Sequence, residues 1–144
     1  MNIFTYLQAN KRAKQQARAY EKRLNEVRLR FPLFCKLHAV TSPDHQGAIA
    51  QSRTGDHLLI VHTPTDERPD CVCAYSVSLN RVLGFLDEGL SQNLTYAFGK
   101  EFCRDGEVEQ ITGGAPYPYF GCNIRLMDSQ DFLEEMENFS LIQE

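Results

Sequence analysis

The distribution of apolar residues between Gly55 and Leu94 predicts a series of short β-strands followed by a helix. Apolar and β-branched residues gather in three segments, and residues typical of turns separate them. Two prolines lie in the first polar break, and an Asn-Arg pair forms the second. The predicted strands are Leu58–Val61, Cys71–Leu79 and Val82–Leu86. This arrangement is typical of a compact β-barrel or α+β module.

The segments on either side extend the same pattern. Three further strands are expected at Leu33–Val40, Glu101–Thr112 and Phe120–Met127. In the first of these strands, alternation places Leu33, Cys35, Leu37 and Ala39 on one face of the sheet.

The segments between the strands predict one helix and one long loop. Leucine, alanine and phenylalanine recur at helical spacing over Asp87–Phe98, and Gly99 is a suitable C-terminal stop. The segment Thr41–Thr54 contains a proline and a glycine and is expected to be a connecting loop, with one helical turn around Ala48–Gln51.

The N-terminal segment is the strongest helix signal in the chain. There is no glycine or proline from Asn2 to Phe31, and Pro32 is expected to end the helix. We predict one continuous helix over residues 10–31. Its apolar positions recur at heptad-like spacing: Ala13, Ala17, Tyr20, Leu24, Val27 and Phe31. This stripe packs either on its own β-domain or on the same helix of a second copy, and the pattern leaves both open.

The predicted fold class is α+β and mainly β: a small six-stranded barrel of OB-like or SH3-like design with one inserted helix. A basic amphipathic helix occupies residues 1–31, the barrel domain residues 32–127, and an acidic C-terminal helix residues 128–144. In that last segment a helix over Ser129–Phe139 would place Phe132, Leu133, Met136 and Phe139 on its buried side.

Charge is divided unevenly along the chain. The formal net charge is -4. Residues 1–31 carry eight basic residues against two acidic ones, so they contribute +6 and the remaining 113 residues contribute -10. The basic block suits nucleic acid or an anionic surface, but it also complements the acidic body of the same chain or of a second chain, and we favour that pairing.

Cysteines and histidines give no pattern typical of a metal or cofactor site. The five cysteines form no CxxC pair and lie among apolar neighbours, which favours reduced core thiols. The four histidines are scattered, as expected of surface or hydrogen-bonded core residues. We expect no metal, no small-molecule cofactor and no catalytic site. The chain shows neither a signal peptide nor an apolar segment long enough to cross a membrane, so we expect a cytoplasmic protein.

Several residues together resemble the HIRAN domain, a small β-barrel found in helicase-like chromatin remodellers and as a stand-alone bacterial protein. The resemblance covers about residues 33–127 and consists of glycines, hydrophobic residues and their spacing. The matching positions are Gly55, Asp56, Leu58 and Ile60 in one strand, Pro64 in the next loop, Asp70–Ala74 and Gly84–Phe85–Leu86 in the following strands, Leu90 and Leu94 in the helix, and Gly121–Leu126 at the end.

This resemblance implies binding of DNA, through a pocket that holds the 3'-hydroxyl end of a single strand. The Tyr-Asp pair of that pocket falls on Glu67 and Arg68, close to Asp70, and both of its members are changed. We therefore expect the preference for a free 3'-hydroxyl to be lost, because no ring is left to stack and a guanidinium prefers phosphate or carboxylate. Alternatively, Arg68 only pairs with Asp66 or Asp70 on a solvated loop.

Two functions remain open from the sequence. The first is a non-enzymatic module with weak DNA binding, to a single strand or a DNA end. The residues expected to contribute are Lys11, Arg12, Lys14, Arg18, Arg68, Phe85, Tyr117 and Tyr119. For the aromatic residues the alternative is packing: Tyr75 and Phe85 inside the barrel, Tyr117 and Tyr119 over its open end. The second function is a protein-interaction or assembly module that forms homodimers through the N-terminal helix.

Overall fold

Six antiparallel strands form the body of the protein, as the sequence predicts. The structure is a computed structural model, and it describes residues 20–99, 101–129, 131 and 134. The elements are α2 (Tyr20–Glu26), β1 (Leu33–Lys36), α3 (Pro43–Ala50), β2 (His57–His62), β3 (Val72–Ser76), β4 (Arg81–Phe85), α4 (Glu88–Phe98), β5 (Cys103–Gly113) and β6 (Phe120–Leu126). No helix among these described elements is long and apolar enough to cross a membrane.

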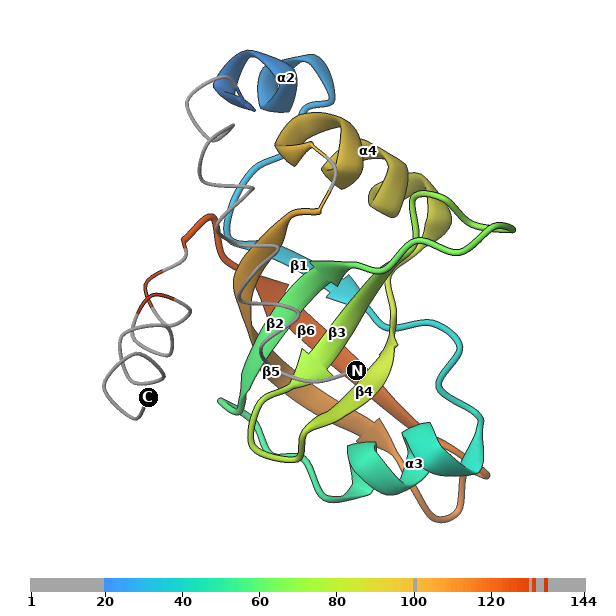
Figure 1. Ribbon diagram of the computed structural model, residues 1–144. Helices are drawn as coiled ribbons and strands as arrows, with labels where there is room; N and C mark the ends of the chain where they lie inside the picture. Colours follow the sequence, from blue (N-terminus) through green and yellow to red (C-terminus); the bar gives the residue numbers. More distant parts are fainter. Residues whose placement is uncertain (1–19, 100, 130, 132–133, 135–144) are drawn as a thin grey trace, which may run out of the picture.

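The strands make one sheet in the order β1-β6-β5-β2-β3-β4, which curls into a half-barrel (Figure 1). Helices α2 and α4 lie at one end of the curled sheet, and α3 lies at the other end. The two edges of the sheet meet at one residue pair just beyond β1. There His38 donates its N–H to the Phe85 carbonyl (2.7 Å) and accepts from the Phe85 N–H (3.0 Å).

Gly84 allows this close approach of the two edges. A Cβ atom at Gly84 would lie 2.9 Å from the His38 carbonyl oxygen and 3.2 Å from the Leu37 Cβ. Any larger residue would therefore push the chain after β1 away from β4.

Both faces of the central strands are buried. The inner face contributes Leu58, Ile60, Ala74 and other residues to the main core. The opposite face carries a second buried cluster, made of Leu59, Val61, Cys73, Tyr75 and Cys103. A strand buried on both faces has a continuous apolar sequence, which is why β2 and β3 were easy to predict.

Helix α4 agrees with the prediction at both ends. The Asp87 carboxylate accepts a hydrogen bond from the Leu90 N–H (3.2 Å), so Asp87 is the N-cap. Gly99 follows the last turn with a φ of 87°, a value that glycine adopts readily.

The prediction of a loop over Thr41–Thr54 is wrong in its first part, because residues 43–50 form the helix α3. Ser42 caps it, and Pro43 occupies the first turn. The Gln46 amide then fixes the helix to its neighbours: it donates to the Val40 carbonyl (2.7 Å) and the Phe120 carbonyl (2.9 Å), and it accepts from the Phe120 N–H (2.9 Å).

The predicted end of the N-terminal helix is also wrong, since α2 ends at Glu26 and not at Phe31. The Leu29 N–H donates to the Leu24 carbonyl (3.1 Å), and Arg28 adopts a left-handed φ of 58°. This is a Schellman ending, and its two leucines are both buried. Of the predicted stripe, Leu24 is buried, and Val27 and Phe31 pack against the domain core.

Several predicted elements lie outside the described residues. They include the helix before Tyr20 with the four basic residues expected to bind phosphates, and most of the predicted helix Ser129–Phe139.

Candidate nucleic-acid interface

The β2–β3 loop, residues 63–71, carries the positions that match the HIRAN pocket pair. Hydrogen bonds close this loop at its base, where the Thr63 N–H donates to the Cys71 carbonyl (2.7 Å). At its tip the Arg68 N–H donates to the Thr65 hydroxyl (2.9 Å), and the Thr65 N–H donates to the Arg68 carbonyl (3.0 Å). These bonds give the loop a defined shape without secondary structure.

His62 connects this loop to the start of β5. Its Nδ1 accepts a hydrogen bond from the Glu101 N–H (3.2 Å), so the ring proton sits on Nε2, which donates to the Pro69 carbonyl (2.8 Å). The ring is buried and stacks on Phe102. His62 is thus a hydrogen-bonded core histidine, in agreement with the expectation from sequence.

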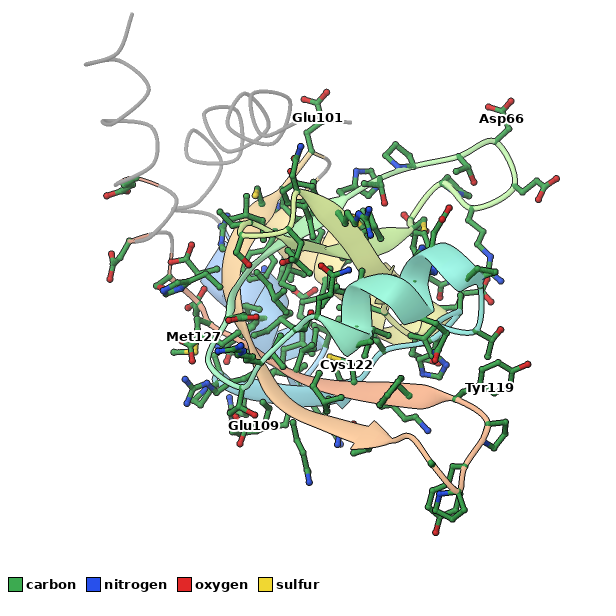
Figure 2. The ribbon with its side chains drawn as sticks, turned by 90° about the horizontal axis from the view of Figure 1, so that it is seen from below. Asp66, Glu101, Glu109, Tyr119, Cys122 and Met127 are labelled. Carbon is green, nitrogen blue, oxygen red and sulfur yellow. The ribbon has the colours of Figure 1, made fainter. Side chains whose placement is uncertain are left out.

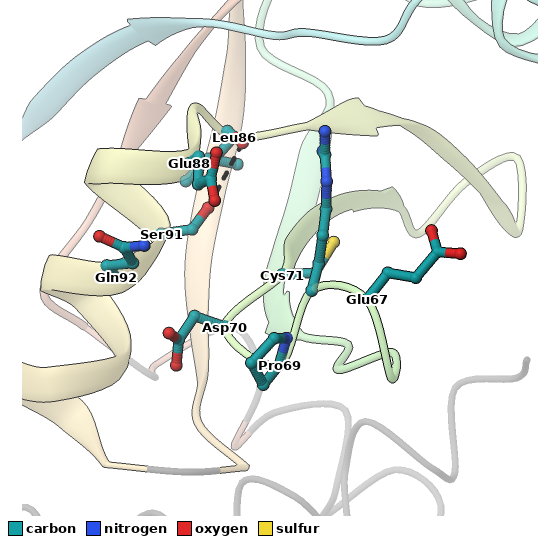
Figure 3. A pocket seen from close by; sticks show the side chains of 9 residues that line it. Glu67, Pro69, Asp70, Cys71, Leu86, Glu88, Ser91 and Gln92 are labelled. Carbon is teal, nitrogen blue, oxygen red and sulfur yellow. Dashed lines mark hydrogen bonds between the residues drawn. The ribbon is translucent and has the colours of Figure 1, made fainter.

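The loop and the first turns of α4 enclose a small pocket of about 90 Å³, which we call the loop pocket (Figure 3). Its lining consists of Glu67, Arg68, Pro69, Asp70, Cys71, Leu86, Glu88, Ser91 and Gln92. The Ser91 hydroxyl donates to the Leu86 carbonyl (3.3 Å), as the dashed line in Figure 3 shows. The structure therefore brings Glu67, Arg68 and Asp70 together at one site.

The loop pocket is poorly suited to a DNA end. The lining includes three acidic residues, Glu67, Asp70 and Glu88, and one basic residue, Arg68. Among the described residues, Arg68 forms no ion pair with Asp66 or Asp70, so the expected pairing is absent. The volume is also well below the ~300 Å³ at which ordinary ligand sites begin. An anionic phosphate would meet an excess of negative charge here.

The predicted aromatic contacts do not gather at this pocket. Phe85 is half-buried and packs with the second cluster, and its ring lies 5.7 Å from that of His45. Tyr75 is buried, as expected for a packed residue. Both residues are packed, as the alternative expected, but they pack in the second cluster on the outer face of the sheet and not inside the barrel.

Tyr117 and Tyr119 lie in the β5–β6 turn at the opposite end of the sheet from the loop pocket (Figure 1). The eleven residues of β5 separate the two places, which corresponds to roughly 35 Å. The two rings are 68% and 52% exposed, so the expectation that they cover an open end of the barrel is wrong. They remain available to a ligand, but not to one held in the loop pocket.

The sequence prediction missed an exposed aromatic residue on the outer face of β1. Phe34 is 60% exposed, and Lys36 follows it on the same face. Both line an open depression of about 350 Å³, which we call the outer depression, together with Cys35, Glu109, Asn123 and Ile124. Figure 2 shows Glu109 on the outside of the sheet. The predicted alternation of β1 already placed Leu33 and Cys35 on the other face, and this signal could have identified Phe34.

The cysteines are all free thiols, three of them buried and two half-buried. Burial raises the pKa of Cys35 to about 11 and that of Cys122 to about 12, and Asp87 adds to the shift at Cys35. A thiol must ionise to act as a nucleophile or metal ligand, so these two are poorly suited to either role. No cluster of three or more potential metal ligands occurs among the described residues.

Comparisons with known proteins do not assign the chain to a family. No family model matches it, and no similar curated protein or solved structure was found.

Proposed function

We propose that this protein is a non-enzymatic binding module related to HIRAN domains, which binds single-stranded DNA weakly. The observation that carries the proposal is the exposed ring of Phe34 beside Lys36 on the outer face of the sheet. Proteins that bind single strands need an aromatic surface for the bases and a cation for the backbone, and these two residues supply both.

The proposal includes a finer description of the fold as an OB-like or SH3-like barrel. Two observations support it: the six-stranded sheet curls until its edges meet at His38 and Phe85, and Gly84 lies where they approach each other. Gly84 belongs to the glycine-aromatic-leucine segment on which the HIRAN resemblance depends.

Charge sets the strength and salt dependence that we expect. The described residues contain ten basic and sixteen acidic side chains, so this part of the protein repels DNA as a whole. We propose that Lys11, Arg12, Lys14 and Arg18 supply most of the phosphate contacts. Binding should then weaken steeply with salt, because each neutralised phosphate of a single strand contributes about -0.7 to the slope of log K against log salt.

The loop pocket should not select a free 3'-hydroxyl. Glu67 and Arg68 offer no ring to stack on a terminal base, and the pocket is too small and too acidic for a nucleotide.

A fluorescence anisotropy titration tests the proposed function. The full chain is titrated against single-stranded, duplex and 3'-phosphorylated oligonucleotides over a range of salt concentrations. We expect weak, salt-sensitive binding of the single strand, with no more than a few-fold difference between 3'-hydroxyl and 3'-phosphate ends. The absence of binding at low salt would refute the function, whereas a strong preference for the 3'-hydroxyl would refute our assignment of Glu67 and Arg68.

The second candidate is a protein-interaction module, and the acidity of the loop pocket favours it. Glu67, Asp70 and Glu88 line a pocket in which the basic side chain of a partner protein would find opposite charge. The N-terminal helix offers less support for assembly, because Leu24 and Val27 pack on their own domain. Light scattering coupled to size exclusion decides the assembly part: a concentration-dependent dimer supports it, and a monomer at high concentration contradicts it.

A further inference from the structure

We propose that the outer depression is a subsite for one nucleotide of a single strand, and that it favours bases with an exocyclic amine. The inference rests on the proposed function and gives it a location and a base preference. It concerns the outer face of β1, β6 and β5, at a different place from the loop pocket.

Strand pairing arranges the side chains of this face in two rows. Lys36 of β1 lies opposite Asn123 of β6, and Phe34 lies opposite Arg125. The Leu37 N–H donates to the Cys122 carbonyl, so Phe34 and Lys36 occupy the non-hydrogen-bonded pairs, in which cross-strand side chains lie closest. The rows therefore form one continuous surface beside the depression.

Phe34 provides the stacking surface. A large apolar side chain that remains 60% exposed on a strand gains little for the core, and its ring is accessible to a planar ligand. The outer depression is open to solvent and offers about 350 Å³, against about 90 Å³ in the loop pocket.

Lys36 is the cation suited to the backbone phosphate. The other cation of these rows, Arg125, already forms an ion pair with Glu107 of β5. Lys36 lines the depression itself, and its flexible side chain can extend from the strand into solvent. A base stacked on Phe34 would thus have its phosphate directed toward Lys36.

Glu109 and Asn123 account for the base preference. A carboxylate only accepts hydrogen bonds, so Glu109 suits the exocyclic amine of adenine, cytosine or guanine. The amide of Asn123 both donates and accepts, and it can pair with the ring nitrogen or carbonyl beside that amine. Thymine and uracil have no exocyclic amine and place a carbonyl oxygen at that position. They would be disfavoured.

The experiment compares short oligonucleotides of deoxycytidine, deoxyadenosine and thymidine in anisotropy titrations of the full chain at low salt. We expect the thymidine strand to bind about 3- to 10-fold more weakly than the deoxycytidine strand. Phe34→Ala should weaken binding of all strands about 5- to 100-fold, the range expected for the loss of one base stack. Tyr96→Ala is the matched control, an exposed aromatic residue on α4 that does not line the outer depression, and it should have little effect.

The isosteric variant Glu109→Gln tests the base preference on its own. An amide can donate as well as accept, so this variant should bind the thymidine and deoxycytidine strands about equally. Glu109 and Phe34 are both exposed, and thermal unfolding of each variant checks that the fold is retained.

The outcomes separate the two proposals. If the wild-type chain binds none of the strands at low salt, the proposed function fails. If it binds them but Phe34→Ala binds no more weakly than Tyr96→Ala, the function stands and the subsite is wrong. If Phe34→Ala weakens binding but the three strands bind equally well, the stacking surface stands and the assignment of Glu109 is overturned.

Discussion

Replacing Gly84 by alanine should open the curled sheet where its two edges meet. The new Cβ would lie 2.9 Å from the His38 carbonyl oxygen and 2.9 Å from Val40 Cγ1. One of these atoms belongs to the main chain and cannot rotate away. The segment from Leu37 to Val40 must therefore move outward, or β4 must shift inward.

Two costs contribute to the expected loss of stability. Moving the segment breaks or stretches the two hydrogen bonds between His38 and Phe85, each of which contributes about 1 kcal/mol. It also displaces Leu37, which is fully buried, and overpacking of this kind costs about 1–3 kcal/mol. The sum is about 3–5 kcal/mol, which for a domain of this size lowers the melting temperature by roughly 10–15 °C.

Gly47→Ala is the matched control. Gly47 lies inside α3, and a Cβ there would have no neighbour within 4 Å. The same chemical change should stabilise the protein by up to about 1 kcal/mol, because alanine is a better helix former. Both Gly→Ala changes reduce the conformational entropy of the unfolded chain by the same amount. The difference between the two free energies of unfolding therefore reflects the folded state.

Urea unfolding of the two variants, followed by circular dichroism, measures this difference. We expect their free energies of unfolding to differ by about 3–6 kcal/mol, with faster amide exchange at His38 and Phe85 in Gly84→Ala. Equal stability of the two variants, with unchanged exchange at these amides, would refute the reasoning that the edges of the sheet meet tightly at Gly84.

Two further predictions concern polar groups inside the fold. Gln46→Glu should lower the free energy of unfolding by about 2–3 kcal/mol at neutral pH, as measured by urea unfolding. The change removes the two amide N–H donors and places a carboxylate against two carbonyl oxygens. The control is Gln51→Glu, at the exposed end of α3, which should change stability little. Burial raises the pKa of Cys35 to about 11 and that of Cys122 to about 12 from the ordinary value of 9.0, so the folded state holds these protons more tightly. Their contribution to stability is complete below pH 9 and is lost as the pH rises toward 11 for Cys35 and toward 12 for Cys122. Unfolding measured from pH 7 to 10.5 under reducing conditions should show this decline, and Cys35→Ala should make it shallower; an unchanged slope would contradict the assignment.

The strands could be predicted because burial leaves a direct mark on the sequence. Val72–Ser76 is buried on both faces and reads as an apolar run, while Asp87 and Gly99 mark the ends of α4 by their capping chemistry. Helix α3 has no such mark, since only Ala48 and Ile49 are buried in it. Its Ser-Pro start was a usable signal, but the contacts of Gln46 that fix it are tertiary and cannot be read from local sequence.

The candidate sites were harder to predict for a related reason. The resemblance to HIRAN domains named Glu67, Arg68 and Asp70, and the structure places them in one pocket. The acidic character of that pocket also depends on Glu88, which comes from a helix some twenty residues later in the chain. Propensity likewise favours burial of phenylalanine, and only the alternation of β1, which places Phe34 on the face opposite Leu33 and Cys35, pointed to its exposure.

Phe34 and Lys36 also lie on an edge strand, and this position leads to the last prediction. Their main-chain groups point away from β6, because the neighbouring residues Cys35 and Leu37 supply the bonds to that strand. An exposed aromatic on an open edge favours pairing with a second chain, and a lysine on the same edge opposes it. Lys36→Ala should therefore increase self-association, seen as a rising scattering intensity at high protein concentration, and adding Phe34→Ala should reverse it. If Lys36→Ala does not self-associate more than the wild-type chain, Lys36 does not prevent pairing at this edge. Its proposed contact with a ligand phosphate is then the remaining role for it.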